Sequence, residues 1–331
     1  MKAAVVGCGA VGARVARQLL ALSTVDQVVL TDSAVERAET VARALGDSAT
    51  VVAGDAHEVP LVDVLVLATP AHAQLQWARN AVRRGVSVVS LTDAIEDVQL
   101  LLGLSDEARA AGVSIVVGAG FCPGLSCVLA RFAAERFDFV DEIHVAKFGT
   151  GGPACARQHH RALSGAALDW REQAWVRRRG GSGRELLWFP EPVAARDCYR
   201  AALADALLLV PSFSDATRIT SRMSATRRDR MTARFPMLRP PHPEGRSGAV
   251  RVELRGRREG MQEVSVVGVS ERTAVGAAAV AATAAAWTIA GRLLPGAAGL
   301  AAMVDPRAFL ADLMDRGIRI FSFDGRPRRE V

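Results

Sequence analysis

The sequence predicts an α/β fold class, with a doubly wound parallel sheet followed by a second domain of mixed α+β structure. Two observations carry this prediction. In the first part of the chain, apolar runs of strand length alternate with segments of helical periodicity, which is typical of β-α-β units. After Gly118 this alternation ends in a turn-rich hinge, 118–124, and longer strand-like stretches follow. A chain of 331 residues has room for two domains.

Six strands and four amphipathic helices account for the first part of the chain. The strands are expected at 2–6, 27–31, 50–53, 63–68, 86–90 and 113–117. The helices between them are expected at 10–22, 33–45, 71–84 and 95–111. Six parallel strands joined by helices make a complete doubly wound sheet.

The second part of the chain is less regular. A helix is expected at 125–136, with alternating strands around 139–149 and 249–269. The Gly/Arg-rich stretch 177–184 and the Pro-rich stretch 236–245 are expected to be loops. An alanine-rich helix near 273–293 and the segment 299–323 close the chain, and we expect at least one of them to pack back on the first domain.

A glycine-rich turn follows the first expected strand, with the sequence Gly7-Cys8-Gly9-Ala10-Val11-Gly12. In this pattern the first glycine permits a tight turn, the second lets a pyrophosphate approach the backbone, and the third lets helix and strand pack closely. The N-terminus of the following helix offers free N–H groups to the phosphates. Because Asp32 follows about 20 residues further on, the sequence predicts a Rossmann domain that binds NAD or NADP.

Asp32 favours NAD, because a carboxylate accepts hydrogen bonds from a ribose hydroxyl and repels a 2′-phosphate. A helix cap at Asp32 or Ser33 is compatible with the same position. Arg37 lies one helical turn on and could bind a 2′-phosphate, so both cofactors stay open.

Other cofactor-binding candidates follow the later strands. Asp55 is expected either to contact the adenine or to form a turn with Gly54. Thr69 and Pro70 lie at the carboxyl edge of the sheet, where the nicotinamide half would pass. Asp93 could orient substrate or cofactor, or cap the next helix.

The charge distribution and composition exclude several classes of function. Residues 1–123 carry a net charge of −4 and the rest of the chain +10, almost all of it from arginine. These arginines could bind a small-molecule substrate that bears a carboxylate, or could simply be solvated. Basic residues are scattered and aromatic residues make up 5%, so no nucleic-acid partner is expected.

The apolar stretch 274–290 is dominated by alanine and bounded by arginines, which favours a buried helix and no membrane partner. The chain opens directly on a strand, so we expect a cytoplasmic protein, and we expect it to form a homo-oligomer, a dimer. Its five cysteines are expected to be free thiols, and their spacing predicts no metal site.

Several segments resemble the saccharopine dehydrogenase-like NAD(P)-dependent oxidoreductases, a family that includes saccharopine reductases, lysine 6-dehydrogenases and carboxynorspermidine dehydrogenases. These segments are Ala68-Thr69-Pro70, the run from Gly85 to Asp93, Ala111-Gly112-Val113, Gly120-Phe121-Cys122-Pro123-Gly124-Leu125, Gly149-Thr150-Gly151-Gly152-Pro153, and Asp315-Arg316-Gly317-Ile318. The resemblance covers roughly 1–153 and 250–320, and 154–248 matches no member.

The resemblance implies hydride transfer at a carbon–nitrogen bond of an amino-acid-like or polyamine-like substrate. It also supports a division of the chain into a dinucleotide-binding domain, 1–123, a substrate and dimerisation domain, 124–272, and C-terminal helices, 273–331. Members of the family often have Asp before Pro-Gly in the hinge, whereas Cys122 stands here. The usual substrate therefore does not follow from the resemblance.

Four residues are candidates for the catalytic machinery. His159 and His160 are expected in a loop near the cleft, where an imidazole titrates in a useful range, although a solvated pair is the alternative. Lys147 would act as a base if burial lowered its pKa, or it could be an exposed strand residue. Cys122 is expected beside the nicotinamide, lining the pocket without reacting.

Two other functions remain open. The first is NAD(P)-dependent reduction of a carbon–carbon double bond or a ketone, which a pocket without carboxylate-binding arginines would favour. The sugar-dehydrogenase relatives carry Glu-Lys-Pro after the fifth strand, whereas Ser90-Leu91-Thr92-Asp93 stands here. The second is a non-catalytic dinucleotide-binding protein.

Overall fold

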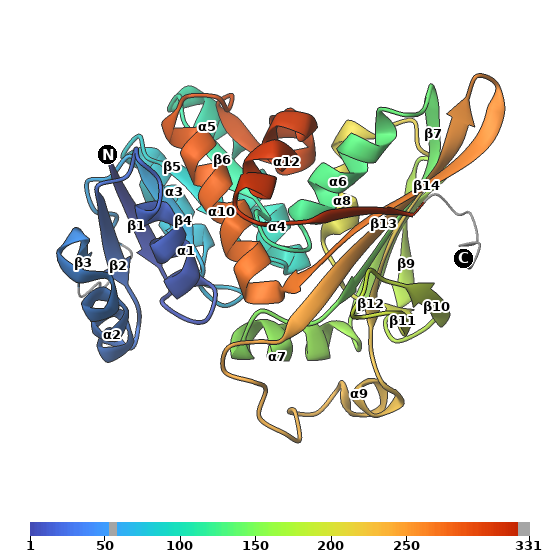
Figure 1. Ribbon diagram of the computed structural model, residues 1–331, viewed down its shortest axis with the longest axis horizontal. Helices are drawn as coiled ribbons and strands as arrows, with labels where there is room; N and C mark the ends of the chain where they lie inside the picture. Colours follow the sequence, from blue (N-terminus) through green and yellow to red (C-terminus); the bar gives the residue numbers. More distant parts are fainter. Residues whose placement is uncertain (53–57, 324–331) are drawn as a thin grey trace, which may run out of the picture.

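The structure is a computed structural model that describes residues 1–52 and 58–323. Two sheets and the helices around them make up the molecule (Figure 1). The first sheet has seven parallel strands in the order β15-β6-β5-β4-β1-β2-β3. The second is mixed, with nine strands. The predicted fold class, a doubly wound α/β sheet with a second mixed domain, is confirmed.

The strands of the first sheet are short, buried runs of valine, leucine and alanine. Every pair in the sheet is parallel, and such strands are apolar on both faces because helices cover both. Their bounds are Lys2–Val6 (β1), Gln27–Thr31 (β2), Ala49–Val51 (β3), Val64–Leu67 (β4), Ser87–Ser90 (β5), Ser114–Val117 (β6) and Gly296–Gly299 (β15). The sequence predicts the first six and misses β15, since Gly-Ala-Ala-Gly has no apolar strand pattern.

The helices beside this sheet follow the predicted alternation with one difference. They are Gly12–Leu20 (α1), Val35–Leu45 (α2), Leu75–Arg83 (α3), Ile95–Leu102 (α4), Ser105–Ala110 (α5) and Thr273–Ile289 (α10), with a short 3-10 turn at Gly46–Ser48 (η1). The single helix expected at 95–111 is two helices, α4 and α5, because the chain turns at Gly103 and Leu104. The alanine-rich helix α10 packs against α1 and against β4 and β5.

The second sheet runs in the order β10-β11-β12-β7-β13-β14-β16, with β8 and β9 attached beside β12. Only the β12–β7 pair is parallel among these strands. Their bounds are Phe139–Phe148 (β7), Ala166–Arg171 (β8), Ala174–Arg179 (β9), Glu185–Trp188 (β10), Ala195–Arg200 (β11), Arg218–Ser224 (β12), Ser247–Arg258 (β13), Met261–Arg272 (β14) and Ile320–Phe323 (β16).

Two expectations for this part of the chain need correction. The stretch 249–269 is a hairpin of β13 and β14, which turns at Glu259 and Gly260, both with positive φ. The stretch 177–184 is not all loop, because Arg177–Arg179 end β9 and pair with β8 while their side chains stay exposed. The Pro-rich stretch 236–245 contains no helix or strand, in agreement with the prediction.

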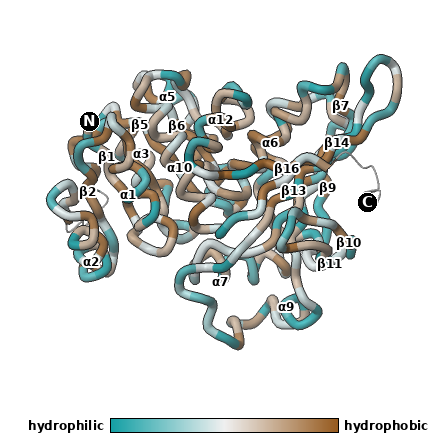
Figure 2. The backbone as a smooth tube through the Cα atoms, in the orientation of Figure 1, coloured by the Kyte–Doolittle hydropathy of each residue, from teal (hydrophilic) through white to brown (hydrophobic). Residues whose placement is uncertain are grey.

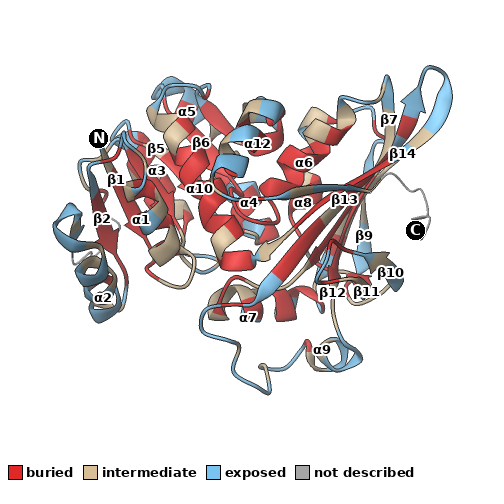
Figure 3. Cartoon of the chain, in the orientation of Figure 1, coloured by how far each residue is buried: buried red, intermediate tan, exposed pale blue. Residues whose placement is uncertain are grey.

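The remaining helices are Leu125–Ala134 (α6), Pro153–Ala162 (α7), Asp205–Leu209 (α8), Arg227–Thr232 (α9), Leu300–Met303 (α11) and Pro306–Asp315 (α12), with a 3-10 turn at Val210–Ser212 (η2). The main hydrophobic core is continuous from the first sheet through α6 and α10 to β13 and β14. Figure 2 shows hydrophobic residues along the strands of the first sheet and a hydrophilic tip on the β13–β14 hairpin. Figure 3 shows the same strands and α10 as buried.

The end of the chain contributes one strand to each sheet. β15 pairs with β6 at the edge of the first sheet, and β16 pairs with β14 at the edge of the second. The division of the chain at 123 and 272 stays a prediction. Within the described residues, every helix is too short or too polar to span a bilayer.

Candidate active site

The predicted phosphate loop joins β1 to α1 with the geometry that its three glycines allow. Gly7 has φ +94°, and a Cβ there would lie 2.7 Å from the Ala68 carbonyl oxygen. A Cβ on Gly12 would lie 1.8 Å from the Gly7 carbonyl oxygen. A Cβ on Gly9, in contrast, would meet nothing within 4 Å, so the second glycine leaves open space for an approaching phosphate.

The loop lines a pocket of about 890 Å³, which we call the central pocket. This volume is within the range of roughly 300–1,000 Å³ that is typical of small-molecule sites. Its walls come from the phosphate loop, the ends of β2 and β4, the hinge, β7, the start of α7, and Pro243 and Glu244. The predicted candidates Gly7, Gly9, Ala10, Val11, Asp32, Thr69, Pro70, Asp93, Cys122 and Lys147 line it.

The groups along this pocket fit a dinucleotide. The hydroxyl oxygens of Thr69 and Thr273, both in pocket-lining residues, are shielded from solvent and have no hydrogen-bond partner among the described residues. An orphaned buried hydroxyl normally marks a place where a ligand or water completes the hydrogen bonding. Thr273 Oγ1 lies against Gly149 and Gly248, so the Thr69 hydroxyl, together with the open space beside Gly9, is the polar partner left for a cofactor.

Asp32 lies at the end of the pocket expected to hold the adenosine. Its buried carboxylate accepts hydrogen bonds from the backbone N–H of Cys8 (2.7 Å) and of Ala34 (2.9 Å). Arg37 Nη1 lies 3.2 Å from Oδ1 of the same carboxylate. Asp32 therefore fixes the phosphate loop and the residue before α2. The N-cap of α2 is Ala34, so the helix cap expected at Asp32 or Ser33 is not found, and the cofactor hypothesis stays open. Asp55 lies outside the described residues.

The most unusual feature of the central pocket is a buried cluster of three polar side chains, Asp93, Lys147 and His159, which we call the pocket-side cluster. His159 Nε2 lies 2.6 Å from Asp93 Oδ2 and 2.8 Å from Lys147 Nζ. Lys147 also donates to the Cys122 carbonyl oxygen at 3.1 Å. Lys147 and Asp93 face the pocket, and His159 lies behind them, 1% exposed.

Two contacts of the pocket-side cluster compete for one atom, Nε2 of His159. Nε2 of an imidazole carries at most one hydrogen, so it can donate to Asp93 or accept from Lys147, but not both at once. With the imidazole protonated, Nε2 donates to Asp93, and the Lys147 ammonium donates to the Cys122 carbonyl oxygen at the pocket surface. This is the arrangement expected of a proton-transfer group.

Electrostatics keep this cluster charged. Burial by itself would lower the pKa of His159, but the negative Cys155 and Asp93 outweigh burial and the nearby ammonium, and the pKa rises to about 9. Burial would raise the pKa of Asp93, but His159 holds it below its usual value. Burial would likewise lower the pKa of Lys147, yet the surrounding acidic groups raise it. The lowered lysine pKa that the sequence hypothesis requires is thus wrong, and Lys147 is an ammonium donor.

The two predicted histidines separate. Both lie on α7 and not in a loop, since the helix begins with Pro153 at its first turn, a favoured position for proline. Consecutive helix positions point in different directions, so only His159 reaches the pocket-side cluster. His160 Nε2 contacts the Thr232 carbonyl oxygen at 2.9 Å and lies away from the central pocket. We do not retain His160 as a catalytic candidate.

Cys155 was not singled out from the sequence, but it joins the site one turn before His159. Its Sγ lies 3.6 Å from His159 Nε2 and 3.9 Å from Asp93 Oδ2, and it lines the pocket. Burial by itself would raise the pKa of this thiol, but the adjacent imidazole lowers it. The four-residue spacing of Cys155 and His159 would have been a signal only if a helix had been expected here, whereas a loop was expected from the sequence.

Cys122 differs from Cys155 in its surroundings. Its thiol donates to Asp205 Oδ1 at 3.2 Å, and Ser126 Oγ donates to the same oxygen at 2.5 Å. Burial and then Asp205 raise the pKa of Cys122 well above its usual value, so it is a neutral thiol that lines the pocket. The Asp205 carboxylate, from α8, lies behind Cys122 and does not line the central pocket.

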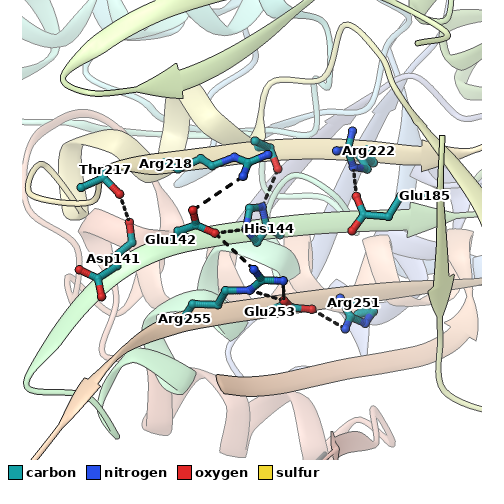
Figure 4. Close-up of polar contacts among 11 residues, drawn as sticks. Asp141, Glu142, His144, Glu185, Thr217, Arg218, Arg222, Arg251, Glu253 and Arg255 are labelled. Carbon is teal, nitrogen blue, oxygen red and sulfur yellow. Dashed lines mark hydrogen bonds and ion pairs between the residues drawn. The ribbon is translucent and has the colours of Figure 1, made fainter. Parts of the chain in front are cut away.

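A second polar cluster lies on the other face of β7 and has no part in the pocket (Figure 4). His144 Nε2 lies 2.9 Å from Glu142 Oε2, and its Nδ1 lies 2.8 Å from Thr220 Oγ1. Arginines from the neighbouring strands surround this pair. We call it the open-face cluster; its members are Glu142, His144, Glu185, Arg218, Thr220, Arg222, Arg251, Glu253 and Arg255.

Comparison with known proteins supports the description of the fold and of the dinucleotide site. Residues 2–111 match the family model described as semialdehyde dehydrogenase, NAD binding domain. The chain is similar in structure to apo saccharopine dehydrogenase (L-Glu forming) from Saccharomyces cerevisiae, with a TM-score of 0.72 and 13% identity over 97% of this chain and 99% of that chain. A probable dehydrogenase from Thermotoga maritima has a TM-score of 0.51 and 10% identity, over 97% and 98% of the two chains.

At these identities the similarity is one of fold. The chain has the fold of saccharopine dehydrogenase, and its first part is a dinucleotide-binding domain of the dehydrogenase type. The resemblance predicted from the hinge and the Gly-Gly-Pro turn is confirmed at that level.

Proposed function

We propose that the protein is an NAD(P)-dependent oxidoreductase that acts on a carbon–nitrogen bond of an amino-acid-like or polyamine-like substrate. The observation that carries the proposal is the pocket-side cluster, a buried Lys–His–Asp group in the same pocket as a dinucleotide phosphate loop. When bound, a nicotinamide cofactor supplies hydride transfer. Gly7, Gly9, Ala10, Val11 and Gly12 would hold its phosphates.

The pocket-side cluster handles the proton. Lys147 presents an ammonium N–H to the pocket, next to the substrate nitrogen, and donates it as the nitrogen becomes an amine. In the reverse direction Lys147 accepts the proton only in its neutral form, because His159 is already protonated and paired with Asp93. Because Asp93 and His159 keep each other charged, the cluster holds this proton across neutral pH.

The substrate site favours a carboxylate-bearing molecule. Arg157 lies on α7 and lines the central pocket, and it is exposed. No ion pair of Arg157 is found within residues 1–52 and 58–323, whereas Arg14 and Arg37, also in the pocket, are both paired. A guanidinium binds a carboxylate through two parallel hydrogen bonds, so Arg157 is placed to orient such a substrate. This argues against reduction of an isolated double bond or ketone.

NAD is the expected cofactor. The Asp32 carboxylate at the adenosine end opposes a 2′-phosphate, and Arg37 is held against that carboxylate. The homodimer and the cytoplasmic location remain predictions from the sequence.

A panel assay tests this function. Purified protein is mixed with NADH or NADPH, an oxo acid and an amine, and in the reverse direction with amino acids and polyamines, and the nicotinamide absorbance is followed. We expect turnover with a carboxylate-bearing substrate and a loss of about 10- to 100-fold in kcat/KM for Arg157→Met. Tight NADH binding without turnover on any C–N substrate would contradict the enzymatic proposal and favour a non-catalytic dinucleotide-binding protein.

A further inference from the structure

Arg14, which the sequence reasoning did not single out, lies at the mouth of the phosphate loop. It is in the first turn of α1, and its Nη1 donates to the Ala10 carbonyl oxygen at 2.6 Å. Its Nη2 lies 2.6 Å from Glu244 Oε2. Both residues line the central pocket. Within the described part of the chain, Glu244 is the acidic partner of this arginine.

Glu244 comes from the far side of the pocket, at the end of the segment that links α9 to β13. Figure 1 shows this segment passing beneath α7. The backbone holds it there: Gly245 has φ +69°, a Cβ on it would lie 2.5 Å from the Thr150 carbonyl oxygen, and Arg246 N–H donates to that oxygen. On the other side, a Cβ on Gly152, just before α7, would lie 2.9 Å from Ala10 Cβ in the phosphate loop.

The arrangement places two positive features together. The N-terminus of α1 directs free N–H groups toward the site where a pyrophosphate would lie. The Arg14 guanidinium has five N–H donors, and two of its contacts are described, so donors remain for a further anion. The Glu244 carboxylate, 56% exposed, is the anion now beside them.

We propose that Arg14 is a ligand of the cofactor pyrophosphate, and that Glu244 occupies its guanidinium until the pyrophosphate binds. This inference rests on the dinucleotide site of the proposed function. Two phosphate charges at the N-terminus of α1 repel a carboxylate on the same guanidinium. Glu244 therefore competes with the cofactor for Arg14. Arg14 gives the pyrophosphate a charged hydrogen-bond donor, which the backbone N–H groups of the loop do not provide.

The two side chains should then affect cofactor affinity in opposite directions. Arg14→Met removes the phosphate contact, and we expect NADH to bind about 10- to 100-fold more weakly. Glu244→Gln removes the competitor, and we expect NADH to bind about 2- to 5-fold more tightly, the scale of a partly exposed ion pair. A purely structural pair would weaken binding in both variants or in neither.

Fluorescence titration with NADH measures these affinities directly, without turnover. Arg17→Met, an exposed arginine one turn further along α1, and Glu107→Gln, on α5, carry the same charge changes away from the pocket and serve as controls. The dissociation constant of ADP-ribose, obtained from competition with NADH, should rise in Arg14→Met, and that of adenosine, which has no phosphate, should be unchanged. Arg14→Lys keeps a charge at this position and should fall between wild type and Arg14→Met.

The outcomes separate this inference from the proposed function. If the wild type binds neither NADH nor NADPH, both are overturned. If the wild type binds NADH and Arg14→Met binds it within twofold, Arg14 is not a pyrophosphate ligand and only this inference fails. Weaker binding by Glu244→Gln would overturn the competing role of Glu244.

Discussion

The two faces of β7 each contribute to a cluster with a histidine–carboxylate pair, yet the two pairs have opposite electrostatics. On the open face, His144 lies 2.9 Å from Glu142, and both side chains are partly exposed. On the pocket face, Lys147 meets His159, which lies 2.6 Å from Asp93 and is 1% exposed. The pairs have similar geometry and differ in their neighbours.

The neighbouring charges decide the direction of each pKa shift. At His144, burial and Arg218 lower the pKa, Glu142 and Glu253 raise it, and the net shift is downward. At His159, burial would also lower the pKa, but Cys155 and Asp93 outweigh it and the pKa rises to about 9. A carboxylate partner alone therefore does not decide the charge of a histidine, because the balance of burial and the surrounding charges differs between the two faces.

The largest difference between the faces should appear in turnover. Lys147→Met removes the only side chain of the pocket-side cluster that donates directly into the pocket, and we expect kcat to fall about 100- to 10,000-fold, the range of a lost general acid. NADH affinity should stay within about twofold, as measured by fluorescence. His144→Gln, on the opposite face of the same strand, is the matched control and should keep full activity. Equal losses of kcat in both variants would mean that the substitutions disturb strand β7 and that the loss does not come from a missing proton donor.

The stability of the protein should depend on pH with opposite sign at the two histidines. The folded-state pKa of His159 lies above its unfolded value, so its contribution is complete below about pH 6.5 and is lost as pH rises through about 9. His159→Gln should therefore lose roughly 3 kcal/mol more at pH 6 than at pH 10.

The folded-state pKa of His144 is lowered, so the wild type loses stability as pH falls from about 6.5. His144→Gln should gain relative to wild type in that range. Urea denaturation of both variants at several pH values measures these differences, and the same pH trend in the two variants would contradict the comparison.

Cys155 gives a chemical probe of the pocket face. All five cysteines are free, and Cys155 alone among them is not fully buried. Since His159 lowers its pKa, iodoacetamide should modify Cys155 first, and His159→Gln should slow the reaction about tenfold. NADH should protect it. Mass spectrometry identifies the modified residue, and faster labelling of Cys122 would contradict the assigned environments.

The smallest effect is expected on the open face. Glu142→Gln weakens contacts to His144, Arg218 and Arg255, but all of these side chains are partly exposed. Such pairs contribute about 0–1 kcal/mol, so the free energy of unfolding should change by less than about 1 kcal/mol. A larger loss in urea denaturation would show that the open-face cluster is covered in solution.

The sequence predicts the first sheet well because its strands are buried on both faces. The bounds of β1 and β2 agree with the predicted 2–6 and 27–31. Their runs of valine, leucine and alanine leave little choice of which residues form each strand. β15 was missed for the opposite reason: Gly-Ala-Ala-Gly carries no pattern, and it becomes a strand only because the open edge of β6 lies beside it.

The site is harder to predict because its members are far apart in the chain. Asp93 lies 66 positions from His159, and Asp205 lies 83 from Cys122, so residue spacing cannot bring them together. The glycine loop was predictable because its chemistry is local. Lys147 was chosen because it is one of two lysines in the sequence. Its burial agrees with the hypothesis of a buried lysine, but the direction of its pKa shift depends on charges that come together only in the folded protein.

The chain end that adds β15 to one sheet and β16 to the other also affects how the protein can be made. A ribosome releases residues 1–123 long before Gly296–Gly299. Until then β6 is an edge strand with free N–H and C=O groups, which can pair with another nascent chain. The first sheet is therefore complete only after residues 296–299 have been made, and a chain truncated before residue 296 should aggregate through β6.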